Sequence, residues 1–463
     1  MDDQSPPRKG CCSLRCGLAL LLHFCNVSMM SQRACLSLTM VAMVNATDAQ
    51  GLPNASTQEP PGDLRNPVYN WSPKIQGLIL SSITYGMLVA QVPVGYLSGI
   101  YPIKNMVGSG LLLSSLLSLL LPLAAGAGAS LVLACRVAQG LSQGTVLVAQ
   151  HTVWTRWAPP AERGRLTSMS LSGLMLGPSV ALFATGHICQ ALGWPVVFYI
   201  FGACGCALSL SWFVLFYDDP KDHPCISLGE KELITASLPE QVGSGGKSVP
   251  IKAVLTSLPV WAISLSCFAY SWTNHIMFLY LPTFISYRLR VDVRENGLLS
   301  ALPHLCSWLL SILAGHAADG LLARKRLSLI AIRKLFTTLG LLLPALLVMG
   351  LLYLGSGFRG TLSLLTLTSA TLGFCTAGMM INPLDIAPRY YGFLKGLTIL
   401  IGMTGGLTSS TLAGIILNQD PVSSWFKIFF LMAAINVTSL VFYLIFAKAE
   451  IQDWATEKQH TRL

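Results

Sequence analysis

The chain has 463 residues, of which 53% are hydrophobic and only 11% are charged. A surface this apolar and this poor in charge does not suit water, so the composition excludes an ordinary soluble protein and predicts a chain embedded in lipid. The formal net charge of +10 does not indicate a nucleic-acid partner, because the basic residues lie mainly in loops on one side of the predicted membrane.

Apolar segments long enough to cross a bilayer as helices recur along the whole chain. Lys and Arg concentrate in the segments on the side of the N-terminus, which by the positive-inside rule places both termini in the cytoplasm. We therefore expect an all-α membrane protein with twelve transmembrane helices, at residues 17–44, 77–99, 106–126, 129–150, 167–189, 196–217, 258–284, 296–318, 335–355, 361–384, 396–417 and 428–447.

These helices divide into two related halves. Gly77 and Gly95 in the second helix recur at the same spacing as Gly297 and Gly315 in the eighth. Parallel halves related by duplication are typical of transporters, in which a central site faces each side of the membrane in turn. The expected segments are a cytoplasmic tail (1–16), an N-terminal six-helix bundle (17–217), a cytoplasmic linker (218–257), a C-terminal six-helix bundle (258–447) and a cytoplasmic C-terminal tail (448–463).

The outer loop at residues 45–76 carries sequons at Asn45 and Asn54, which we expect to be glycosylated because the topology places them outside the cell. At the other end of the chain, Thr461, Arg462 and Leu463 resemble a ligand for PDZ domains. Many unrelated tails end in this way, so a scaffold partner is one alternative and chance is the other.

Two arginines lie within predicted helices, Arg33 in the first and Arg136 in the fourth. A guanidinium stays protonated and costs about 2.5–3.5 kcal/mol at the bilayer centre, so each must face a partner or a wet cavity. No Asp or Glu lies at membrane depth to neutralise them. The pair predicts a cavity that attracts anions. The alternative is that either arginine binds backbone carbonyls as part of the scaffold.

Neutral polar residues in the second half can orient a substrate: Tyr270 and His275 in the seventh helix, and Asn382 in the tenth. His275 is either a pH sensor or a hydrogen-bonded packing residue. No buried acid is available for proton coupling, whereas sodium coupling can use neutral oxygens. An enzyme is not expected, because the chain has no nucleophile with a nearby base and no metal-ligand spacing, and we expect neither a metal nor a cofactor.

The inner ends of the helices carry a second charged group. Lys104 follows the second helix, and Asp319 and Arg324 follow the eighth in a pattern that resembles the inner-loop signature of the major facilitator superfamily. This pattern predicts a gate, which Asp385 and Arg389 at the inner end of the tenth helix would join. The basic residues can also serve topology alone.

Several longer motifs resemble solute carrier family 17, which includes the vesicular glutamate transporters, sialin and the type I sodium-phosphate cotransporters. The resemblance covers nearly the whole chain. It implies a major facilitator fold of two pseudo-symmetric bundles, and an anion carrier in which the arginines matching Arg33 and Arg136 bind the substrate. The motifs are Arg33-Ala-Cys-Leu-Ser-Leu, Trp71-Ser-Pro73, Arg136-x-x-Gln139-Gly140, Trp157-Ala-Pro-Pro160 and Leu384-Asp-Ile-Ala-Pro-Arg389-Tyr390.

The departures from the family pattern narrow the expected function. The vesicular and lysosomal members have a Glu where this chain has Gln143 and a His where it has Leu80, and the glutamate carriers have an Arg in place of Tyr270. These differences argue against proton coupling and against glutamate. The renal members imply a carrier of phosphate with sodium, and of organic anions such as urate with chloride sensitivity, in the apical plasma membrane of epithelium.

Two other functions are also compatible with the sequence. One is a proton-coupled vesicular or lysosomal organic-anion symporter, and the other is an anion channel. An anion that moves alone would be driven by the membrane potential, at about 2.3 kcal/mol per charge per 100 mV.

Overall fold

The computed structural model of the chain describes residues 13–44, 68–97, 101–158, 160–237, 250–353, 357–419 and 421–455. Asn45, Asn54, the last three residues and the side chain of Arg389 lie outside this description, so their expected roles stay predictions. The described residues are helical apart from turns, loops and one isolated β-bridge between Val44 and Tyr69.

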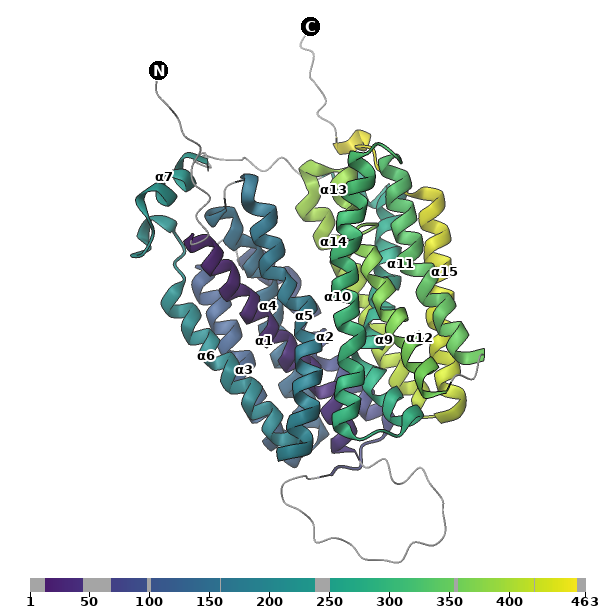
Figure 1. The fold of residues 1–463 in the computed structure, drawn as a ribbon. Helices are drawn as coiled ribbons and strands as arrows, with labels where there is room; N and C mark the ends of the chain where they lie inside the picture. Colours follow the sequence, from purple (N-terminus) through teal and green to yellow (C-terminus); the bar gives the residue numbers. More distant parts are fainter. Residues whose placement is uncertain are drawn as a thin grey trace, which may run out of the picture.

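Two helical bundles lie side by side (Figure 1). The first consists of α1 (Leu14–Met43), α2 (Pro73–Leu97), α3 (Ile103–Ala127), α4 (Ala129–Trp157), α5 (Pro160–Leu192) and α6 (Trp194–Leu215). The second consists of α9 (Leu258–Leu289), α10 (Val293–Ala323), α11 (Leu329–Tyr353), α12 (Phe358–Thr371), η3 (Leu372–Thr376), α13 (Asn382–Ile386), η4 (Pro388–Tyr390), α14 (Tyr391–Leu417) and α15 (Pro421–Phe446). Between and after them lie η2 (Pro220–Asp222), α7 (Leu228–Ser237), α8 (Ile251–Thr256) and η5 (Asp453–Ala455).

Within the described ranges, nine helices are long and apolar enough to cross a membrane: α1, α3, α4, α5, α6, α10, α11, α14 and α15. Helices α2, α9 and α12 fall outside this set. In α9 the polar run at residues 271–275 interrupts the apolar sequence. Apolar side chains cover the outside of both bundles, as lipid-facing helices require.

The predicted helix at 361–384 is wrong in its second part, because α-helical structure ends at Thr371 and resumes only at Asn382. Two glycines bring this segment close to its neighbours. A methyl group on Gly373 would come within 2.8 Å of the α10 backbone, and one on Gly378 within 2.6 Å of the α11 backbone. Glycine is also a poor helix former. The low helix propensity of these two residues and their close contact with α10 and α11 together explain why the α-helix is interrupted here.

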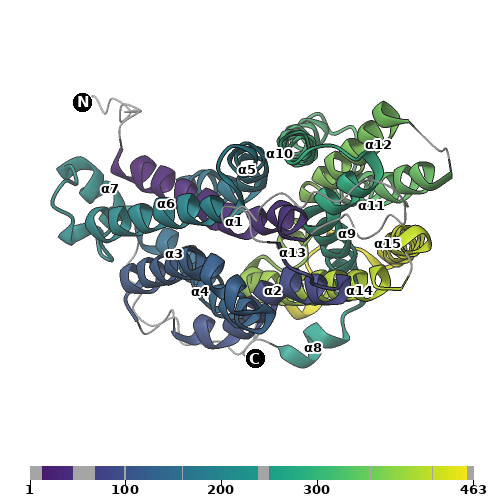
Figure 2. The ribbon, with the colours of Figure 1, turned by 90° about the horizontal axis from the view of Figure 1, so that it is seen from below.

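The bundles meet closely at the end opposite to α7 and α13. There a methyl group on Gly77 of α2 would come within 2.6 Å of the backbone of Gly414 in α14, and one on Gly297 of α10 within 2.8 Å of Gly186 in α5. The view along the helices shows α2 beside α14 and α5 beside α10 (Figure 2). The two glycines that recur in sequence, Gly77 and Gly297, thus occupy corresponding contacts between the bundles.

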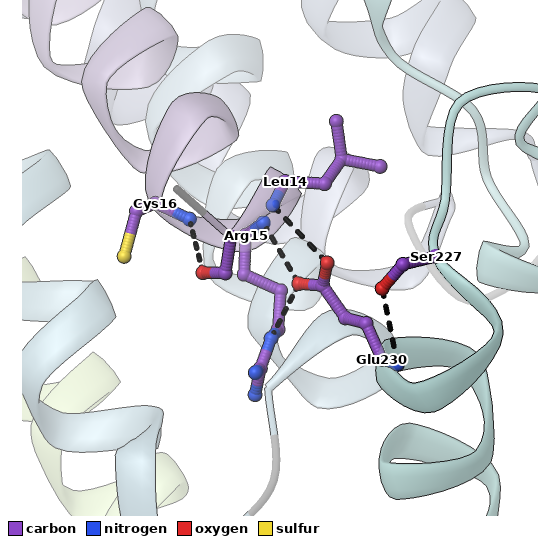
Figure 3. Close-up of polar contacts among 6 residues, drawn as sticks. Leu14, Arg15, Cys16, Ser227 and Glu230 are labelled. Carbon is purple, nitrogen blue, oxygen red and sulfur yellow. Dashed lines mark hydrogen bonds and ion pairs between the residues drawn. The ribbon is translucent and has the colours of Figure 1, made fainter. Parts of the chain in front are cut away.

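The first part of the segment between the bundles packs on the first bundle (Figure 3). The Glu230 carboxylate of α7 accepts hydrogen bonds from the backbone N–H groups of Leu14 and Arg15, each at 3.2 Å, and from Arg15 Nε at 2.8 Å. Ser227 caps α7 by accepting from the Glu230 backbone N–H at 3.3 Å. A carboxylate at the start of α1 also complements the partial positive charge of that helix end.

Candidate functional site

Arg33 lies where the two bundles face each other. Its Nη2 is 3.4 Å from Thr84 Oγ1 of α2 and 3.1 Å from His275 Nε2 of α9, and its Nη1 is 3.6 Å from Met87 Sδ of α2. The guanidinium carbon is 5.6 Å from the centre of the Phe278 ring, also on α9. A side chain of α1 therefore contacts α9 of the other bundle directly, through a charged group.

The hydrogen bonds of His275 determine which ring nitrogen carries the proton. Its Nδ1 is 2.9 Å from the Ser271 carbonyl oxygen, which can only accept, so Nδ1 is the donor. The neutral ring then presents the lone pair of Nε2 to Arg33, whose Nη2–H donates to it. Gly406 of α14 leaves room for the imidazole, because a methyl group there would come within 2.4 Å of the ring.

Arg136 has a different environment. Only 1% of its surface is exposed, and its Nη1 donates to the Gln32 carbonyl at 3.2 Å and to Gln139 Oε1 at 2.8 Å. Its Nη2 donates to the Arg33 carbonyl at 3.4 Å. Arg136 thus binds the carbonyl oxygens of the two peptide groups that flank Arg33 in the α1 backbone. These are the scaffold contacts that the sequence left open as its alternative.

A network of neutral side chains surrounds this backbone, and the sequence analysis did not predict it. Ser114 Oγ donates to Gln32 Oε1 at 2.8 Å, and Gln32 Nε2 donates to Ser115 Oγ at 2.9 Å. Gln143 Nε2 donates to Ser114 Oγ at 3.1 Å and Gln139 Nε2 to the Ser114 carbonyl at 3.2 Å. Amides and hydroxyls from α1, α3 and α4 therefore satisfy one another without adding charge. The sequence could have indicated this network, because Gln and Ser residues occur within otherwise apolar helices.

The positive charge at this site is not neutralised by the described part of the chain. Neither Arg33 nor Arg136 forms an ion pair with a described carboxylate, and the buried Nε–H groups of both lack an acceptor among the described residues. Unmet buried donors are costly, and Coulomb interactions are strong where water is scarce. An anion beside Arg33 would supply both the missing charge and a missing acceptor.

Two of the predicted substrate residues lie elsewhere. Asn382 is fully buried, and its Nδ2 donates to the Tyr443 hydroxyl at 2.8 Å, among the core residues of the second bundle. Tyr270 packs against the same core, one helical turn and more from His275 on α9. The structure does not bring either residue into the group of side chains that contacts Arg33.

The predicted gate residues form one ion pair, with a partner that the sequence analysis missed. Asp385 accepts from Arg333 Nε at 2.7 Å and from Arg333 Nη2 at 3.2 Å, while Arg333 Nη1 donates to the Ala377 carbonyl at 2.8 Å. Arg333 was assigned to a loop because the predicted helix began at residue 335, whereas α11 begins at Leu329.

The other gate residues have different surroundings. Asp319 and Arg324 are exposed, and neither has an ion-pair partner in the described part of the chain. Lys104 places its ammonium 4.1 Å from the centre of the Tyr217 ring, and its backbone N–H donates to Asp218 Oδ1 at 3.0 Å. Lys104 therefore packs on the first bundle and contacts the beginning of the linker.

Comparison with known proteins identifies the fold and the family. Residues 22–409 match the model of the Major Facilitator Superfamily. A bacterial homologue of the human lysosomal transporter Spinster, in an inward-facing and occupied conformation, superposes with a TM-score of 0.72 at 12% identity, covering 94% of this chain and 97% of that one. A D-xylose-proton symporter superposes with a TM-score of 0.68 at 14% identity, covering 93% and 98%. At these identities the likeness concerns the fold alone.

The curated relatives are much more similar in sequence. The chain is 62% identical to sodium-dependent phosphate transport protein 1 of Oryctolagus cuniculus and 60% identical to that of Homo sapiens, with all of each chain covered. It is 47% identical to a probable small intestine urate exporter of Homo sapiens over 98% of this chain and 94% of that protein.

The two-bundle fold and the family match define a multi-pass membrane transporter, not an enzyme. The chain belongs to the Major Facilitator Superfamily and, within it, to the family of the sodium-dependent phosphate transport proteins, solute carrier family 17, which is related to the urate exporters. The family predicted from the sequence motifs is thereby confirmed.

Proposed function

We propose that this transporter carries phosphate together with sodium, and organic anions such as urate, across the apical plasma membrane by alternating access. The names of the relatives support phosphate, sodium and urate. The observation that carries the proposal is the position of Arg33, a permanent cation between the bundles whose partner from the second bundle is a neutral imidazole. Chloride sensitivity and the apical location rest on the family resemblance.

The proposed topology adds three crossings to the nine candidate spans: α2, α9, and the unit from α12 to α13. Two pseudo-symmetric bundles, at residues 17–217 and 258–447, are then joined by a cytoplasmic linker, with both termini in the cytoplasm. The corresponding contacts of Gly77 and Gly297 support this symmetry. In this topology those contacts lie at the outer ends of α2 and α10, so the two bundles are in close contact on the outer side.

The anion binds by replacing His275 at Arg33. The His275 Nδ1–H is occupied by the Ser271 carbonyl, so its Nε2 lone pair faces the guanidinium and repels an anion. His275 in this tautomer competes with the anion for Arg33 instead of binding it. Binding of the anion breaks the contact between α1 and α9, and this loss of a cross-bundle bond couples binding to movement of the bundles.

Arg136 is a positioning residue in this mechanism. Its hydrogen bonds to the carbonyls of Gln32 and Arg33 orient the α1 backbone, while its charge adds to the field that attracts the anion. At the inner end, the Asp385–Arg333 pair and the contact of Lys104 with the linker hold each bundle together. We assign Asp319, Arg324 and Arg389 to the same inner gate on the basis of the family pattern.

Replacing Arg33 by Ala tests the proposal in proteoliposomes that take up labelled phosphate or urate from the external medium. Uptake should fall to background while the protein remains monodisperse and folded, because Arg33 is the cation that binds the anion in this proposal, whereas Arg136 donates its hydrogen bonds to the α1 backbone. Arg359→Ala is the matched control, since Arg359 is exposed at the start of α12 and should leave uptake unchanged. Retained uptake by the Arg33 variant refutes the proposed site.

Separate gradients distinguish the alternatives. Uptake driven by a sodium gradient or by voltage agrees with the proposal, whereas uptake that follows a proton gradient at fixed voltage indicates a vesicular or lysosomal symporter. Unitary currents without saturation by substrate indicate a channel.

A further inference from the structure

An open surface cavity of about 530 Å³ lies on the second bundle, away from Arg33. It is formed by α8, the first turn of α9, the last turn of α15 and the residues that lead into η5. Helix α8 lies beside the second bundle in the view along the helices (Figure 2). The volume is within the usual range of roughly 300–1,000 Å³ for small-molecule sites.

The wall of this cavity has an apolar part and a part that donates hydrogen bonds. Leu258 and Ile445 belong to the apolar part, and they are 49% and 65% exposed. Lys448 and Trp454 belong to the other part. Lys448 has no ion-pair partner among the described residues, and the buried indole N–H of Trp454 has no described acceptor. None of the lining residues is acidic.

The cavity also lies at the boundary of a membrane span. The candidate span in α15 is Ser423–Phe446, so the last apolar residues line the cavity together with Lys448, two positions beyond. A lysine directly after an apolar helix end lies at the level of the lipid headgroups. Lys252 on α8, also exposed, adds a second positive charge nearby.

We propose that this cavity binds an anionic glycerophospholipid of the cytoplasmic leaflet, with the phosphate at Lys448 and Trp454 and the acyl chains along Leu258 and Ile445. An ammonium and an unpaired N–H are the groups that a headgroup phosphate needs, and the apolar wall continues into the hydrocarbon. Inorganic phosphate has the same charge chemistry but gains nothing from the apolar wall, so it binds more weakly. The bound lipid connects α8 to the ends of α9 and α15.

The test uses the purified full chain in nanodiscs of phosphatidylcholine with or without phosphatidylserine, and native mass spectrometry of the lipid retained after extraction. The wild-type chain should retain phosphatidylserine in preference to phosphatidylcholine. Lys448→Ala should lower that retention about fivefold, as expected for one basic residue near a charged membrane surface. Trp454→Phe keeps the ring, removes the N–H and should lower retention as well. Lys427→Ala is the matched control, an exposed lysine at the other end of α15, and should have no effect.

Three results would overturn the proposal: equal retention of the two lipids, retention that neither variant changes, or loss of the lipid on adding millimolar inorganic phosphate, which would mark a site for free anions. Lipid retention does not depend on transport, so failure here is distinct from failure of the proposed function.

Discussion

The hydrogen bond between Arg33 and His275 leads us to predict that removing the His275 imidazole increases the affinity for the anion. In the structure His275 Nε2 accepts from Arg33 Nη2 at 3.1 Å, and an anion must replace this acceptor to reach the guanidinium. A hydrogen bond to a charged group contributes about 1.5–3 kcal/mol. His275→Leu removes the competing acceptor from the anion-free protein, so the affinity for phosphate should increase by roughly 10- to 150-fold.

The assay is equilibrium binding of labelled phosphate to the purified protein, together with KM and maximal velocity in proteoliposomes. His275→Gln is the control, because its side-chain carbonyl can still accept from Arg33, and its affinity should stay close to that of the wild type. The Leu variant should also turn over more slowly, because tighter binding slows release. Weaker phosphate binding by His275→Leu would refute the argument and make His275 an anion ligand.

Two further predictions concern the contacts between and within the bundles. Gly414→Val places methyl groups against the backbone of Gly77, so spin labels at the adjoining ends of α2 and α14 should move apart in electron-resonance distance measurements. The control is Gly396→Val on the same helix, where the added side chain enters open space and should leave the distance unchanged. An unchanged distance in the Gly414 variant would contradict the close packing of the two bundles at this end. Asp385→Asn leaves the Arg333 charge without its partner and should destabilise the second bundle by about 3 kcal/mol, at the lower end of the range for a buried pair because both side chains are about a tenth exposed. A lower thermal unfolding temperature in detergent checks this, against the exposed Asp319→Asn as control, and equal temperatures for the two variants would contradict it.

The class of protein and its family could be predicted from the sequence. Composition excludes a water-soluble protein, and the motifs around Arg33 and Arg136 identify the family because they are long and in register along nearly the whole chain. The two arginines stand out by a local rule, the cost of a guanidinium in an apolar helix. The recurring glycines at 77 and 297 also stand out, as a repeat within one chain.

Helix limits and pairings were less accessible. Arg333 was missed because α11 begins six residues earlier than predicted. The residue therefore lies on the helix, where it pairs with Asp385, and not in a loop. The break after α12 depends on the approach of Gly373 and Gly378 to α10 and α11. Hydrophobicity along the chain carries no signal for either event, since both depend on which helices become neighbours.

The sequence by itself therefore determined that this is a helical membrane transporter with permanent positive charge and no acid at the same depth. Only the tertiary structure distinguished the two arginines: Arg136 donates to the backbone of α1, whereas Arg33 extends to α9 and the imidazole of His275. Periodicity and charge are local properties of a chain, and they place a residue on a helix. The direction of a side chain toward a partner that is 242 positions away depends on how the helices rotate and pack against one another.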